Sequence, residues 1–174
     1  MKNILNWVKP IFVVVSGCCL LPLSPATMAL AEPPLLVATT TTFNSIGVKQ
    51  AVYYFTLQVP TNSREPVRGV TFTQRQGLEQ IGFDEKGSYA FVGTPGRKGE
   101  SLAIALSTND RQNQTTTVTF NQPLAPGQTV TIALRPFRNP IYEGVYLFEL
   151  AALPSSPSTQ SQSIGIGRLQ FYQD

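Results

Sequence analysis

VYYFTLQV, residues 52–59, is the stretch that decides the fold. Every second position of it is large and apolar: Tyr53, Phe55, Leu57 and Val59. Because side chains alternate between the two faces of an extended strand, these four groups share one face. A period of two in a sequence rich in aromatic and β-branched residues predicts a half-buried strand and not a helix.

Similar short segments recur along the chain, separated by turn residues. The predicted strands are 67–73, 88–92, 102–106, 115–120, 129–134, 145–150 and 164–172, with 32–42 as a further edge strand. With 13 glycines and 14 prolines in the sequence, only residues 77–81 leave room for one helical turn. Eight or nine short strands predict an all-β fold, an immunoglobulin-like antiparallel β-sandwich, with a small β-barrel as the alternative.

The N-terminal segment has the features of an export signal. Lys2 and Lys9 flank the start of an almost wholly apolar run, and residues 29–31 form the small-x-small pattern that signal peptidase cuts. We therefore expect residues 1–31 to be a signal peptide and residues 32–174 to form a single β-sandwich domain. Export to the periplasm or the cell exterior follows from this expectation.

A second processing route is open at Cys18. Residues 15–18 resemble the lipobox of bacterial lipoproteins, in which the cysteine is acylated and holds the protein on a membrane. Lipoprotein tethers run through water and are normally polar, whereas the segment after Cys18 is apolar. We favour cleavage after Ala31 and keep a lipid-anchored envelope assembly factor as the alternative.

Charge argues against a nucleic-acid partner. Loss of Lys2 and Lys9 from the 13 basic residues would leave 11 against 10 acidic ones, a net charge of +1 instead of +3. No basic tract remains after the leader, and nucleic-acid binding depends on clustered Lys and Arg. The expected partner is an envelope protein or a glycan, with membrane contact only if Cys18 is acylated.

The residue inventory excludes several chemistries. The sequence contains no histidine, and both cysteines lie in the predicted leader. Triads built on His, and zinc or copper sites with His or Cys ligands, are therefore closed to the predicted domain by itself. No glycine-rich phosphate loop occurs; Gly165 and Gly167 lie in a predicted strand. We expect no cofactor, no metal site and no enzymatic activity.

Paired carboxylates are the remaining route to catalysis, as in glycoside hydrolysis. The candidates are Glu65, Glu79, Asp84, Glu85, Glu100, Asp110, Glu143 and Glu149. Most stand beside turn residues and are expected to face solvent; Glu149 lies in an apolar strand, beside an arginine. A carboxylate-based glycan-acting enzyme is therefore the alternative function.

An arginine-proline corner at 134–150, LRPFRNPIYEGVYLFEL, is the candidate binding site. Pro136 cannot donate to a sheet ladder, so the strand is expected to end at Leu134. In a stiff polyproline-like segment Arg135 and Arg138 would project in similar directions and could clamp an anion, with Tyr142 beside them. The interpretation that we favour over an anion clamp is structural: each arginine holds the loop through a carbonyl or a carboxylate, such as Glu143 or Glu149.

Three further loops are predicted from turn residues. Residues 84–87 (Asp-Glu-Lys-Gly) are expected to form a turn between strands, and Arg97 and Lys98 to lie at a hairpin tip. Residues 153–163 are expected to form an exposed loop before the last strand.

These segments together resemble a known family. The corner stretch, with IGIGRLQFY downstream and YYFTLQVP, EPVRGVTFTQ and FVGTPGRKGE upstream, is similar to secreted cyanobacterial proteins grouped as domain of unknown function 2808. The resemblance spans about residues 53–172. It implies export and a place in a bacterial envelope, and it implies no catalytic residues. We expect a non-enzymatic binding or structural module of the cell envelope.

Overall fold

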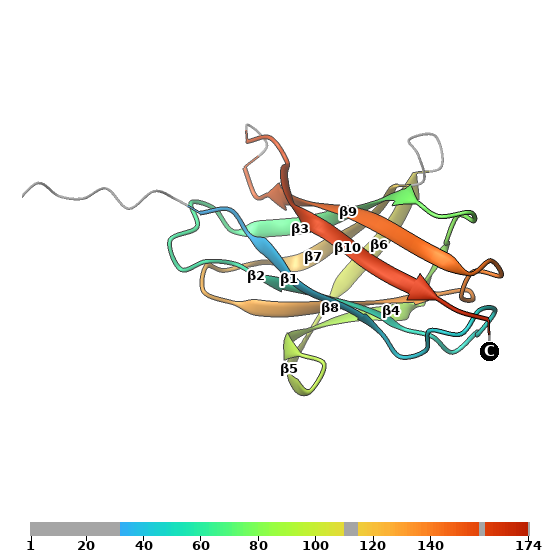
Figure 1. The fold of residues 1–174 in the computed structure, drawn as a ribbon. Coiled ribbons are helices and arrows are strands. Elements are labelled where there is room, and N and C mark those ends of the chain that lie inside the picture. The colour runs from blue at the N-terminus through green and yellow to red at the C-terminus, as the bar shows by residue number, and fades with distance from the viewer. Residues whose placement is uncertain (1–31, 110–114, 157–158, 174) are drawn as a thin grey trace, which may run out of the picture.

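The computed structural model describes residues 32–109, 115–156 and 159–173. Ten antiparallel strands in these residues form two packed sheets of five, with no helix in the described parts of the chain, so the predicted β-sandwich is confirmed (Figure 1). The predicted leader, its cleavage site and Cys18 lie outside the described residues. The strands are β1 (Leu35–Thr41), β2 (Tyr53–Gln58), β3 (Val67–Gln76), β4 (Phe83–Thr94), β5 (Arg97–Leu102), β6 (Ile104–Asn109), β7 (Thr115–Leu124), β8 (Thr129–Pro136), β9 (Gly144–Pro154) and β10 (Gln162–Phe171).

The strand order is immunoglobulin-like. One sheet has the order β1-β2-β8-β4-β5, and the other has β10-β9-β3-β7-β6. The first four strands of the first sheet correspond to A-B-E-D of an immunoglobulin constant domain, and β10-β9-β3 correspond to G-F-C. The remaining three, β5 to β7, are inserted between the D and E equivalents and lengthen both sheets at one side.

The inserted strands account for one wrong boundary. The alternating stretch 102–106 is predicted as one strand, but the chain changes sheets at Ala103, so Leu102 ends β5 and Ile104 begins β6. The apolar alternation continues across the crossover because both halves face the same core. Residues 95 and 96 form the hairpin turn between β4 and β5, so Arg97 and Lys98 lie beside the tip, as predicted.

The core lies between the sheets and is dominated by aromatic rings. Tyr53, Phe55 and Leu57 of β2 point inward and are almost completely buried. The Phe55 ring packs edge-on against Phe72 of β3 and Phe148 of β9, at centroid distances of 5.0 and 5.9 Å. Such edge-to-face pairs contribute about 1 kcal/mol each beyond the burial of apolar area. The period-two pattern of the opening stretch therefore places its large side chains where the two sheets meet.

Two glycines close one side of the sandwich, where β1 of one sheet lies against β10 of the other (Figure 1). A Cβ on Gly167 would lie 2.7 Å from the Phe55 ring and 2.9 Å from Thr39 Oγ1, and a Cβ on Gly165 would lie 3.0 Å from Leu36. Residues with side chains would push the strands apart. Close packing of β1 on β10 therefore explains the Gly-Ile-Gly sequence.

Four local predictions are wrong. Residues 77–81 form no helical turn; the chain bends at residues 78 and 79. Residues 84–87 do not separate two strands; they form an irregularity inside β4, where the pairing with β8 shifts between Asp84 and Tyr89. The strand before the corner does not end at Leu134, because Arg135 and Pro136 still pair with Asp84 and Phe83. The 153–163 loop is shorter than predicted, since β9 runs to Pro154 and β10 begins at Gln162.

Candidate functional site

The arginine-proline corner is held by an ion pair. Arg138 Nη2 donates to Glu79 Oε1 at 2.6 Å, and Nη1 lies 3.5 Å from Oε2. The same carboxylate accepts the Ile141 N–H at 2.8 Å. Glu79 thus ties the β3–β4 connection to the β8–β9 connection. This is the structural role that the sequence analysis favoured, but the partner is Glu79 and not Glu143 or Glu149; Glu149 pairs with Arg75.

Arg135 and Arg138 do not converge. Arg135 is exposed at the end of β8, and its side-chain carbons lie beside Gly87 of β4, whereas Arg138 turns toward Glu79. Tyr142 is exposed, and its carbonyl accepts the Tyr146 hydroxyl at 3.1 Å. An anion clamp would require Arg138 to leave its carboxylate. The roles of Arg135, Arg138 and Tyr142 as ligand contacts stay predictions.

Asn139 is the residue that sequence reasoning missed at this corner. It is completely buried; its Oδ1 accepts the Tyr53 hydroxyl at 2.8 Å, and its Nδ2 donates to the carbonyls of Phe43 and Ser45. Burial is the main cause that raises the pKa of Tyr53 above its ordinary value, so the hydroxyl remains a donor. The one sequence signal for Asn139 was its place directly before Pro140 in the stiff corner.

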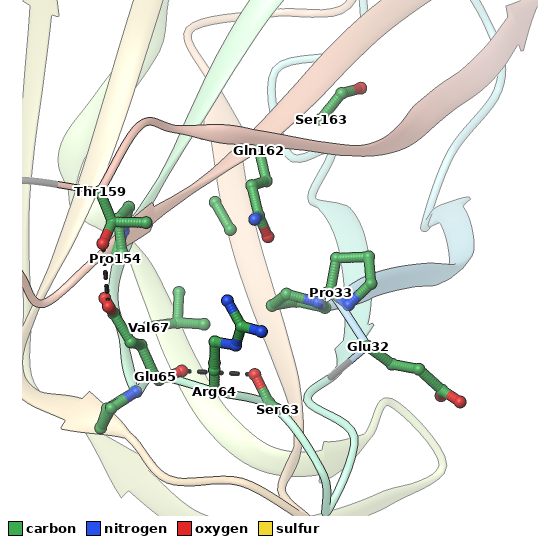
Figure 2. A pocket seen from close by; sticks show the side chains of 13 residues that line it. Glu32, Pro33, Ser63, Arg64, Glu65, Val67, Pro154, Thr159, Gln162 and Ser163 are labelled. Atoms are coloured by element: carbon green, nitrogen blue, oxygen red, sulfur yellow. Dashed lines mark hydrogen bonds between the residues drawn. The ribbon is translucent and has the colours of Figure 1, made fainter. Parts of the chain in front are cut away.

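An open pocket of about 650 Å³ lies at the opposite end of the sandwich (Figure 2). Its walls come from three segments: the chain before β1, the β2–β3 connection, and the ends of β9 and β10. Prolines from all three segments line it: Pro33, Pro34, Pro66 and Pro154. Because proline has a fixed φ and loses little entropy on ordering, these walls are stiff.

Arg64 and Glu65 bring charge to this pocket. Figure 2 shows the Arg64 guanidinium projecting into the middle of the pocket, and Arg64 has no hydrogen bond or ion pair with any described residue. Glu65 turns the other way and accepts the Thr159 hydroxyl at 2.8 Å. The Ser63 hydroxyl donates to the Glu65 carbonyl at 3.3 Å and bridges the two ends of this turn. The pocket therefore presents a cation without a described partner, between walls that combine prolines with polar side chains.

The geometry of the pocket gives little support to the alternative function, a carboxylate-based glycan-acting enzyme. Glu32 and Glu65 both line the pocket, but Figure 2 shows the Glu32 carboxylate pointing out of it and the Glu65 carboxylate turned toward Thr159. Two carboxylates that flank one bond must face each other across a groove. Among the described residues no three His, Cys, Asp or Glu side chains are grouped as a metal site would need.

The sequence contained this pocket only as separate parts. Glu65 was among the candidate carboxylates, and Arg64 stands in a connection that was read as a turn. The pocket forms because the β2–β3 and β9–β10 connections meet, about 90 residues apart in the sequence, as the Glu65–Thr159 bond shows. No local sequence pattern predicts that these two connections meet.

No helix in the described parts of the chain is long and apolar enough to cross a membrane.

Fold and pocket define an immunoglobulin-like β-sandwich domain with an open cavity between loops at one end. The chain belongs to the family described as "Protein of unknown function (DUF2808)", whose model matches residues 27–171. This confirms the family suggested by the sequence segments. No curated protein matches the chain.

Several solved structures are weakly similar. A cohesin module from a Clostridium perfringens family 33 glycoside hydrolase has 9% identity and a TM-score of 0.40, covering 78% of this chain and 96% of the module. The collagen-binding domain of a Staphylococcus aureus adhesin has 9% identity and a TM-score of 0.39, covering 78% and 97%. The KRT10-binding region domain of the pneumococcal protein PsrP has 10% identity and a TM-score of 0.43, covering 76% and 98%. At such low scores these similarities carry no argument about this chain.

Proposed function

We propose that this protein is a non-enzymatic binding module of the bacterial cell envelope, and that its pocket holds an anionic group of an envelope glycan or protein. The observation that carries the proposal is Arg64. Its guanidinium lies in an open pocket without a partner among the described residues. An arginine whose charge is not used inside the fold is available for a carboxylate, phosphate or sulfate, which it binds through two parallel hydrogen bonds.

The position of the pocket supports this function. It lies between the β2–β3 and β9–β10 connections, which correspond to the B–C and F–G loops of an immunoglobulin domain. In antibody variable domains these two loops carry part of the antigen-binding surface, because the sandwich holds both at one end. The correspondence is one of position, and the chemistry of the ligand is argued from Arg64 alone.

The envelope location rests on the N-terminal segment and on what the family resemblance implies. A cleaved leader at 1–31 would leave Glu32, which lines the pocket, as the first residue of an exported cyanobacterial protein. Acylation at Cys18 would instead tether the pocket end of the domain toward a membrane. Mass spectrometry of the native N-terminus separates the two, since acylation adds the mass of fatty acids to Cys18.

The test of the proposal is a titration of purified envelope fractions, glycan and protein separately, into wild type, Arg64→Gln and Arg68→Gln. Arg68 is the matched control, because it is also exposed and without a described partner but lies outside the pocket. We expect Arg64→Gln to weaken binding about tenfold or more, and Arg68→Gln to change it less than about threefold. Equal binding by wild type and Arg64→Gln would refute the site. Turnover of the ligand, abolished by a carboxylate substitution, would instead show an enzyme.

A further inference from the structure

A second surface with its own chemistry lies on the outer face of the β1-β2-β8-β4-β5 sheet. Outer faces of sandwich sheets usually carry polar side chains. Here Ala133 of β8 pairs with Tyr54 on one side and with Tyr89 on the other, and the two hydroxyls lie 3.3 Å apart. Ala133 itself is completely buried. The two half-buried tyrosines therefore lie on either side of a small buried residue on the outer face of the sheet.

The next row of the same face completes a platform. Thr131 of β8 pairs with Thr56 and with Phe91, and the Phe91 ring stacks with Tyr89 at a centroid distance of 6.0 Å. Burial and the hydrogen bond with Tyr89 raise the pKa of Tyr54, so its hydroxyl is neutral at ordinary pH. The platform consists of the half-buried rings of Tyr54 and Tyr89, backed by the buried ring of Phe91, and none of the three lines the Arg64 pocket.

Lys98 brings a positive charge over this platform. Its ammonium lies 5.3 Å from the centroid of Phe91, 5.6 Å from Tyr89 and 5.9 Å from Tyr54. Lys98 is exposed on the edge strand β5 and forms no ion pair with a described carboxylate. The Lys98 ammonium therefore interacts with the faces of these three rings and with no described carboxylate.

We propose that this platform binds an acidic glycan, with a sugar ring stacked on Tyr54 and Tyr89 and its carboxylate or sulfate paired with Lys98. The aromatic faces carry negative partial charge and attract the C–H groups of a flat sugar face. The tyrosine hydroxyls supply hydrogen bonds at the edge of the ring. A ligand cation is disfavoured, because Lys98 already occupies the ring faces and Arg97 precedes it.

A charge on a flexible stem makes this arrangement adaptable. Lys98 can leave the rings for an anionic substituent at small cost, because an exposed cation over an aromatic face is held weakly. The sugar ring then occupies the space that the ammonium leaves. A single-stranded nucleic acid would also offer flat rings and negative charge. The near-neutral predicted domain, with 11 basic and 10 acidic residues, favours the glycan.

The test uses protein expressed from the full-length sequence and isothermal titration with four probes. These are a short oligogalacturonate, a sulfated dextran, a neutral maltooligosaccharide and a single-stranded oligonucleotide. The variants are Lys98→Gln and Tyr54→Leu, and the matched control is Lys86→Gln. Leucine at position 54 removes the aromatic ring but still covers Ala133. Lys86 is also an exposed lysine of the same sheet, but it lies in the β4 irregularity away from the rings.

We expect binding of one or both acidic glycans, weakened about tenfold or more by Lys98→Gln and by Tyr54→Leu and within about twofold of wild type in Lys86→Gln and Arg64→Gln. Carboxylate and sulfate ligands are distinguished by which acidic probe binds. The proposal is overturned if neither acidic glycan binds, if Lys98→Gln binds like wild type, if the neutral oligosaccharide binds as tightly, or if the oligonucleotide binds more tightly.

Discussion

Asn139→Ala tests which contacts stabilise the arginine-proline corner, at the end of the sandwich opposite the Arg64 pocket. The side chain makes three hydrogen bonds: one from the Tyr53 hydroxyl and two to the carbonyls of Phe43 and Ser45. Removing it leaves the Tyr53 hydroxyl buried and without its acceptor. The Phe43 carbonyl keeps the Thr41 hydroxyl as a donor at 2.8 Å, so its loss is smaller.

The expected cost follows from these contacts. A buried polar group that loses its partner costs about 1–3 kcal/mol, and the space left by the amide adds roughly 1 kcal/mol. We therefore expect Asn139→Ala to lower the free energy of unfolding by about 3 kcal/mol, which is roughly 10 °C in melting temperature for a domain of this size. In a double-mutant cycle of Asn139→Ala with Tyr53→Phe, the coupling energy between the two positions should be about 1–2 kcal/mol.

Urea unfolding followed by circular dichroism measures these differences. Asn121→Ala is the matched control, because Asn121 is exposed and has no recorded side-chain hydrogen bond; its change should stay within about 0.5 kcal/mol. A loss below about 1 kcal/mol in Asn139→Ala, or additive effects of the two single variants, would refute the reasoning. Ligand binding at the Arg64 pocket should not change, since that pocket lies at the other end of the sandwich (Figure 1).

Three further predictions concern other parts of the fold. Gly167→Ala should cost about 1–3 kcal/mol through contact with the core, whereas Gly96→Ala, which has open space around it, should be nearly neutral in the same denaturation assay. The raised pKa of Tyr53 means that above about pH 10 the folded protein keeps a proton that the unfolded chain loses, so the contribution of Tyr53 to the unfolding free energy should be constant below about pH 10 and fall as pH rises above it; Tyr53→Phe should show a shallower alkaline fall, and an unchanged slope there would contradict this cause. Arg138→Ala should cost about 1 kcal/mol and Arg135→Ala less than about 0.5 kcal/mol, because only Arg138 holds a carboxylate and that pair is partly exposed; equal losses in thermal melts would contradict the assignment.

Periodicity predicted the fold because the core imposes it directly. The alternation in β2 survives in the structure as inward-facing rings, whereas β8 is buried on both faces from Val130 to Leu134, which its sequence pattern does not report. Boundaries were less predictable. Ala103 joins two strands of different sheets, and no residue there differs from the middle of a strand, so the crossover is fixed by tertiary packing and not by local propensity.

The candidate site was harder to predict than the fold. Arg138 was correctly singled out as a residue held in a stiff corner, but its partner Glu79 comes from a connection that sequence reasoning read as a helical turn. The pocket depends on the contact between Glu65 and Thr159, which lie on two separate connections. The Lys98 platform was missed because Tyr89 and Phe91 are the large alternating residues of 88–92, which is typical of a core-facing side, whereas the residue of this segment that enters the core is Ala90. Contacts across strands decide all three sites, and a single sequence does not report them.

The central claim is that ligands bind at the pocket around Arg64. The most direct measurement is a nuclear magnetic resonance titration of the isotope-labelled protein with the envelope fraction that binds it. We predict chemical-shift changes concentrated at Ser63, Arg64, Thr159 and Gln162, which line the pocket, and their loss in Arg64→Gln. Changes confined to the opposite end, around Arg138 and Tyr142, with none at the pocket, would contradict the claim.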